Sequence, residues 1–105
     1  MDAAREYYRA IDAHAYDELA ALLAPDFTHY RPDRTIEGRE AFVGFMRDDR
    51  PMTDTSHEVV AVFESEAGVA VRGRLLDSDG EELFGFVDVF EFSPDGIVSV
   101  HTYTR

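Results

Sequence analysis

The stretch FGFVDVFEF, residues 84–92, sets one carboxylate among four phenylalanines. Alternate side chains of a β-strand share a face, so Asp88 lies on the same face as every second residue around it. Those neighbours are Phe84, Phe86, Phe90 and Phe92. We therefore predict a strand whose aromatic face looks into an apolar hollow, with Asp88 inside it.

The same two-residue period surrounds this segment. Turn-forming sequences (SEAG, DSDGE and SPDG) separate the segments that show it. The predicted strands are residues 57–66, 68–76, 82–92 and 97–105. Gly73 and Gly85 fall inside strands, where glycine permits the bend of a curved sheet.

The first half of the chain has helical spacing instead. Its apolar residues recur every three or four positions, and one short extended segment interrupts the pattern. The predicted helices are residues 2–15, 16–24 and 39–49, and the extended segment is 27–31. Helices followed by an antiparallel meander indicate an α+β fold, a single domain over residues 1–105. A strongly curved sheet wrapped on three helices would enclose a cone-shaped cavity.

The charge limits the classes of partner. Twenty-two acidic residues face ten basic ones, all arginine, for a net charge of −12. Like charges repel, so we expect neither nucleic acid nor an anionic membrane as a partner. The excess of acid and the absence of lysine favour a halophilic origin, and a bias toward arginine codons is the alternative.

The sequence offers few other ways to do chemistry. It lacks cysteine, metal-ligand spacing, a phosphate-binding loop and a nucleophile motif, so we expect no cofactor and no metal. The longest apolar run, residues 19–24, is too short to span a membrane. No leader sequence is evident, and we expect a cytoplasmic protein.

Two segments resemble a known family. YYRAIDAHAYDELAALLAPDFTHY, residues 7–30, and DVFEFSPDGIVSVHTY, residues 88–103, are similar to SnoaL-like and ketosteroid-isomerase-like members of the nuclear transport factor 2-like superfamily. The resemblance implies a curved sheet over three helices, a deep apolar pocket, and a homodimer formed through the outer face of the sheet. It identifies the fold better than the activity.

The resemblance also implies roles for individual residues. Tyr7 falls at the position of the tyrosine, and Asp88 at that of the aspartic acid, which together bind an oxyanion in ketosteroid isomerases. The proton-shuttling aspartate of those enzymes has no counterpart, because Arg31 takes its place, followed by Pro32 as in the family. We expect His29, on the inner face of the first strand, to substitute for it.

Three interpretations of Asp88 follow from its aromatic setting. Poor solvation raises the pKa of a carboxyl group, so Asp88 can stay protonated and donate a hydrogen bond to an oxyanion. Arg31 across the pocket would instead keep it ionised as a general base. Alternatively, it forms a structural ion pair or caps backbone groups. Apolar walls with His57 at the rim complete the predicted site, and the wall residues are Phe27, Phe45, Phe63, Phe86 and Phe90.

Three functions are compatible with this pattern. The first is a cofactor-free enzyme of isomerase or hydratase type, which moves protons on a small apolar carbonyl or hydroxyl compound through Asp88, Tyr7, His29 and Arg31. The second is a non-catalytic module that binds a small ligand in the same cone. The third is a domain that serves only to associate subunits.

Overall fold

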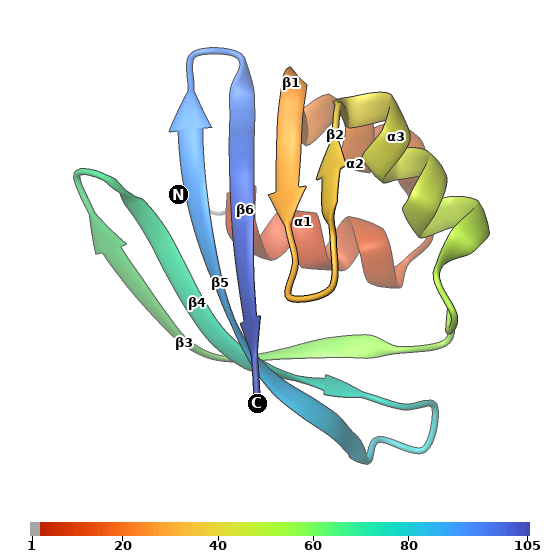
Figure 1. Cartoon of the computed structure of the whole chain (residues 1–105). Helices are drawn as coiled ribbons and strands as arrows, with labels where there is room; N and C mark the ends of the chain where they lie inside the picture. Colours follow the sequence, from red (N-terminus) through yellow and green to blue (C-terminus); the bar gives the residue numbers. More distant parts are fainter. Residues whose placement is uncertain (1–2) are drawn as a thin grey trace.

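The computed structural model describes residues 3–105, and Figure 1 shows the helices gathered on one side of a curved sheet. The predicted α+β fold is confirmed. The elements, in chain order, are α1 (Ala3–Asp12), α2 (Tyr16–Leu22), β1 (Leu23–Tyr30), β2 (Thr35–Glu37), α3 (Arg39–Gly44), the π-helical turn η1 (Phe45–Asp49), β3 (Ser56–Ser65), β4 (Gly68–Leu76), β5 (Glu82–Ser93) and β6 (Gly96–Thr104). The helix start predicted at residue 2 lies outside the described residues.

The sheet has six strands in the order β2-β1-β6-β5-β4-β3. All neighbours are antiparallel except β1 and β6, which run parallel. The long strands β3 to β6 form the predicted meander, because each turn between them is short enough to close a hairpin. None of the helices within residues 3–105 is long and apolar enough to cross a membrane.

The first helix ends at Asp12 rather than at residue 15, and two further differences from the prediction lie around β1. This strand begins at Leu23 rather than at residue 27, because Leu23 already pairs with Ile97 before an irregular stretch that contains Pro25. Proline lacks an N–H donor, and an irregular stretch tolerates it. The edge strand β2 was not predicted, since three residues are too few to show alternation.

A β-bulge in β3 changes which side chains face the helices. Val59 pairs with Gly73 and Ala61 with Arg72, which leaves Val60 without a partner. One extra residue reverses the inward and outward alternation beyond it. Opposite the bulge, a Cβ atom on Gly73 would clash with the backbone oxygen of Glu58 and lie 2.8 Å from the ring of Phe86, so a glycine is needed at this position.

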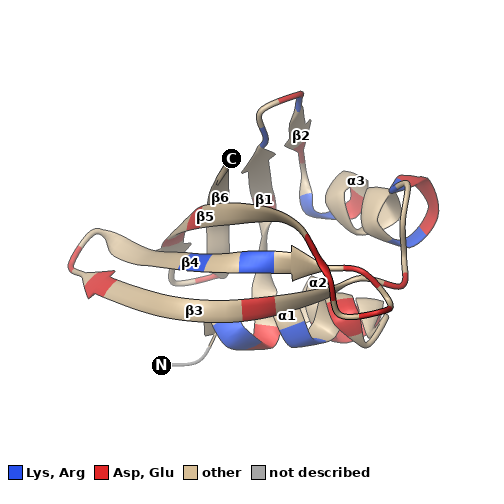
Figure 2. Cartoon of the chain, turned by 90° about the horizontal axis from the view of Figure 1, so that it is seen from below, with Lys and Arg blue, Asp and Glu red and all other residues tan. Residues whose placement is uncertain are grey.

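The core between sheet and helices is packed with aromatic rings in contact with one another. Phe27 packs edge-on against Phe42 with ring centroids 4.8 Å apart, and Tyr7 against Phe90 at 5.2 Å. Figure 2 shows charged residues along β3, β4 and α1, at the end of α3 and in the loops, and acidic residues dominate the β4–β5 hairpin. Beside this core, the enclosed space remains open.

Candidate functional site

A cavity of about 260 Å³ opens between the concave face of the sheet, α1 and the segment after η1. Its mouth carries exposed apolar side chains, Met52, Leu83 and Phe84. The apolar residues that line it are Ile11, Pro32, Met46, Pro51, Met52, Leu75, Leu83, Phe84 and Phe86. The polar ones are Tyr7, His29, Arg31, Arg50, Thr55, His57, Asp88, Thr102 and Thr104. Such a mixture suits a small apolar molecule that is oriented by a few polar groups.

Asp88 lies at the inner end of this cavity and is only 6% exposed. Strand pairing sets it between Val71 on β4 and Thr102 on β6. Its Oδ1 accepts a hydrogen bond from the Thr102 hydroxyl at 2.5 Å, and its Oδ2 accepts one from the Tyr8 hydroxyl at 2.7 Å. Burial raises the pKa of Asp88, although both hydrogen bonds and the charges of His57 and Arg31 lower it.

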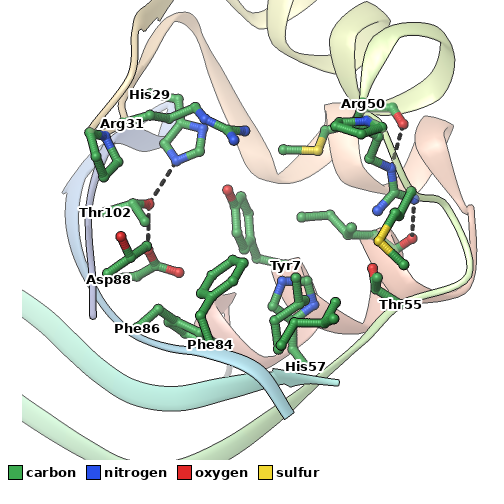
Figure 3. Close-up of a pocket in the computed structure, with 18 residues that line it drawn as sticks. Tyr7, His29, Arg31, Arg50, Thr55, His57, Phe84, Phe86, Asp88 and Thr102 are labelled. Atoms are coloured by element: carbon green, nitrogen blue, oxygen red, sulfur yellow. Dashed lines mark hydrogen bonds between the residues drawn. The ribbon is translucent and has the colours of Figure 1, made fainter. Parts of the chain in front are cut away.

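The hydrogen-bond chain continues from Thr102 to His29. His29 Nε2 lies 2.8 Å from the Thr102 hydroxyl oxygen, and Figure 3 shows the three side chains in sequence along the wall. Since Thr102 donates its proton to Asp88, it accepts from an Nε2–H of His29. Burial and the charge of Arg31 lower the pKa of His29 to about 3. The ring is therefore neutral near pH 7, and its buried Nδ1 has no partner among the described residues.

Tyr7 and Tyr8 have different surroundings although they are adjacent. Tyr8, not Tyr7, binds Asp88. The Tyr7 hydroxyl makes no hydrogen bond within residues 3–105, and Figure 3 shows it pointing into the cavity. Burial and the charge of Asp88 raise the pKa of Tyr7, so its hydroxyl stays protonated and can donate to a bound oxygen atom.

His57 faces the cavity from β3 and is held from behind by the last residue of α1. Asp12 Oδ1 lies 2.6 Å from His57 Nδ1, and Asp12 Oδ2 accepts the His57 backbone N–H at 2.8 Å. A carboxylate at Nδ1 fixes the proton there and leaves a lone pair on Nε2. That nitrogen has no hydrogen-bond partner among residues 3–105, and His57 lines the open space beside Phe86.

Two guanidinium groups complete the polar lining. Arg31 stacks over the ring of Phe45 at 5.2 Å and donates from Nε to Asp33 at 3.2 Å. Arg50 follows η1 and donates to three neutral oxygen atoms, which belong to Met46, Ile11 and Tyr16. In the described part of the chain, no three acidic or histidine side chains gather in a way that would hold a metal ion.

Of the five phenylalanines predicted to form the walls, only Phe86 lines the cavity. Phe27 and Phe90 are fully buried in the core, and Phe45 lies beneath the guanidinium of Arg31. Phe63 is 58% exposed on the outer face of the sheet, because the bulge at Val60 reverses the alternation of the residues that follow it. The expected aromatic walls are thus replaced largely by aliphatic, methionine and proline side chains.

Several site residues were not predicted, although some left a signal in the sequence. Asp12 and Tyr8 are four residues apart on the buried stripe of α1 that begins at Ala4, so an acid on that stripe indicates a buried partner. Thr102 lies on the inward face of its strand, in register with Asp88. No pattern in the sequence indicated that Arg50 faces the cavity, because Arg50 lies just beyond the end of a helix, where helical spacing no longer applies.

The chain matches a family model described as SnoaL-like domain over residues 4–101. An NTF2-like protein of unknown function from Cytophaga hutchinsonii ATCC 33406 superposes with a TM-score of 0.84 at 19% identity, over 99% of this chain and 88% of that one. A "putative ketosteroid isomerase" from Kribbella flavida DSM 17836 also has a TM-score of 0.84, at 25% identity over 98% of this chain and 75% of its own.

A "putative polyketide cyclase" from Sinorhizobium meliloti superposes with a TM-score of 0.85 at 15% identity, over 98% of this chain and 94% of that one. No curated protein matches the sequence. These likenesses establish the cone fold shared by NTF2-like proteins. Together with the family match, they confirm the resemblance seen in the sequence: the chain belongs to the SnoaL-like domain family.

Proposed function

We propose that this protein is a cofactor-free proton-transfer enzyme of isomerase or hydratase type, acting on a small, largely apolar carbonyl or hydroxyl compound. The observation that carries the proposal is a pair of ionisable groups that line one apolar cavity from two strands of the sheet, β3 and β5. One is His57, whose Nε2 is kept free by Asp12. The other is Asp88, whose pKa is raised by burial. Such a pair supplies a base and an acid to the same bound molecule.

In the first step, His57 Nε2 takes a proton from the carbon next to the carbonyl group of the substrate. The electron pair of that C–H bond forms a C=C bond, and the carbonyl π pair moves onto oxygen. Tyr7 donates a hydrogen bond to this oxygen, because its protonated hydroxyl points into the cavity. A donor that needs no rearrangement stabilises the developing negative charge.

In the second step, Asp88 delivers its proton. Delivery to a distant carbon of a conjugated system completes an isomerisation. Delivery to a hydroxyl group, which departs as water with the C–O bonding pair, completes an elimination, and the reverse reaction is a hydration. Tyr8 and Thr102 then stabilise the Asp88 carboxylate by hydrogen bonds until protons exchange with water through the mouth of the cavity.

The test follows exchange of carbon-bound protons in heavy water by NMR, on a panel of small enolisable ketones and hydroxyketones. Exchange reports the first step without knowledge of the product. We expect His57→Gln to lower the exchange rate by about a hundredfold or more. Asp88→Asn should retain exchange while losing isomerised or dehydrated product. Absence of exchange with every compound that binds would contradict the proposal.

A second function deserves the same test, because both oxygens of Asp88 already have donors in the protein. A satisfied carboxyl group suits a module that binds a small ligand without changing it. In that case a ligand would occupy the cavity, no proton of the ligand would exchange, and the NMR titration of the Asp88 carboxyl would not move when the ligand is added.

We also propose a homodimer formed through the convex face of the sheet. Register aligns Tyr30, His101, Val89, Ala70 and Phe63 in one row across five strands. Tyr30 and Phe63 are exposed, and the Tyr30 ring stacks on His101 with centroids 4.3 Å apart. Apolar side chains on an open sheet face favour association. Sedimentation equilibrium should show a dimer for the wild type and a monomer for Phe63→Asp. A wild-type monomer at all concentrations would contradict this.

A further inference from the structure

The cavity is positively charged for a protein that is so acidic overall. Two guanidinium groups, Arg31 and Arg50, line it, and Asp88 is its only lining carboxyl group among the described residues. The chain as a whole has a net charge of −12. A cation facing an apolar cavity requires a partner, because arginine does not lose its proton.

Arg50 is half-buried and lacks the carboxylate partner that an inward-facing arginine usually has. Its Nε donates to the Met46 carbonyl at 2.7 Å, and its Nη2 lies 3.2 Å from the Tyr16 hydroxyl and 3.5 Å from the Ile11 carbonyl. All three are neutral oxygen atoms that fix the plane of the guanidinium without balancing its charge. No carboxylate within residues 3–105 forms an ion pair with it, and Nη1 makes no hydrogen bond there. The guanidinium of Arg50 is thus fixed in position, and its Nη1 is available to donate hydrogen bonds to a ligand.

Arg31 differs, because the protein supplies its counter-charge. Asp33 accepts a hydrogen bond from Arg31 Nε at 3.2 Å, and the ring of Phe45 supports the guanidinium. Its charge lowers the pKa of both His29 and Asp88, so it acts on groups at the inner end of the cavity. Arg50 is therefore the free anion-binding group of the pair.

We propose that the ligand carries a carboxylate, which Arg50 binds, attached to an apolar body that reaches across the cavity. Figure 3 shows Arg50 on the opposite side of the cavity from Asp88 and Thr102, with Tyr7 and His57 between them. A carboxylate on Arg50 therefore places the rest of the molecule against the proton-transfer groups. This inference rests on the proposed function. It narrows the class of substrate to a small oxo or hydroxy monocarboxylic acid with an apolar chain or ring.

The test compares benzoylpropionate with its methyl ester by calorimetry or by NMR titration. The two share an aromatic ring and an enolisable ketone, and the ester replaces the carboxylate by a neutral group that is one methyl larger. We expect the wild type to bind the acid at least about tenfold more tightly, because charge-assisted bonds to a guanidinium are strong. Arg50→Gln should abolish this preference while the affinity for the ester changes little. Arg31→Gln is the matched control and should retain most of the preference.

Two outcomes would overturn the inference: equal binding of acid and ester by the wild type, or a preference that survives in Arg50→Gln. If Arg50→Gln does not fold, Arg50→Lys keeps the charge and should keep part of the preference. Asp88→Asn separates this inference from the proposed function. Asp88→Asn should bind the acid more tightly than the ester, as the wild type does. This preference is expected even if the proposed function is wrong and no form of the protein exchanges a ligand proton.

Discussion

The two ends of the cavity use their polar groups in opposite ways. At the inner end, Tyr8, Asp88, Thr102 and His29 form one hydrogen-bonded chain in which nearly every donor and acceptor is occupied by the protein. Toward the mouth, the side chain of His57 is held from behind, and its outer nitrogen has no partner in the described part of the chain.

This difference distinguishes polar groups that stabilise the fold from polar groups that are available for binding or proton transfer. A buried network stabilises the fold when every member has a partner, and it then has little left for a ligand. A group held on one side and free on the other is prepared for a ligand or a proton. Apart from Asp88, the proposed acid, mutations at the inner end should therefore act mainly on stability, and those toward the mouth mainly on binding and rate.

The largest effect is expected from Asp12→Asn. The asparagine amide would donate to His57 Nδ1 and drive the proton to Nε2, which removes the base. Proton exchange should fall by roughly a hundredfold to a thousandfold, in proportion to the loss of general base catalysis. NMR exchange measures this, and thermal unfolding checks that the link to the His57 backbone survives. Unchanged exchange in a folded variant would exclude His57 as the base.

The next effect is a loss of stability in acid that comes from His29. Burial lowers the pKa of His29 from 6.5 to about 3, so its contribution is complete above pH 6.5 and is lost as pH falls toward 3. The unfolded chain takes up the proton first, which costs on the order of 5 kcal/mol across that range. Urea unfolding as a function of pH should show this loss in the wild type and less of it in His29→Gln. Parallel profiles would contradict the assignment.

Asp88 should act in the opposite direction and so provides the control. Its pKa is raised from 3.8, so its stabilisation is complete below pH 3.8 and is lost as pH rises through the higher value in the folded state. Asp88→Asn should remove that decline and leave the slope that comes from His29.

The smallest effect, and the sharpest comparison, comes from two adjacent tyrosines. Tyr8→Phe removes a hydrogen bond to a buried carboxyl group and should lower the free energy of unfolding by about 1.5–3 kcal/mol. Tyr7→Phe removes a hydroxyl without a protein partner, so stability should change by less than about 0.5 kcal/mol while the exchange rate falls. Urea unfolding measures both. Equal destabilisation by the two substitutions would mean that the two ends do not differ as described.

Much of the fold was predictable, because alternation and helical spacing are local properties of the sequence. The inward direction of Asp88 follows from the same alternation, and the structure confirms it. The outward direction of Phe63 did not follow, because a single bulged residue at Val60 reverses the pattern without a local sign. Prediction by alternation holds only as far as the first irregularity.

The site was less predictable, since it depends on contacts between distant segments. Both tyrosines of α1 lie on its buried side, and nothing in the helix itself shows which one reaches Asp88. The pair formed by Asp12 and His57 joins residues 45 positions apart. The halophilic origin stays a prediction, as the geometry of one cavity does not bear on it.

The π-helical turn η1 has a consequence for how the charge of this cavity can change in evolution. A π-helical turn holds one more residue than an α-helical turn, and here it ends where Arg50 begins to leave the helix. Deleting one codon in residues 45–49 would turn everything after it by about 100° around the helix axis. Such a deletion would carry the Arg50 side chain away from the cavity without any substitution, so close relatives that differ in length at this point should also differ in the charge of the compounds they accept.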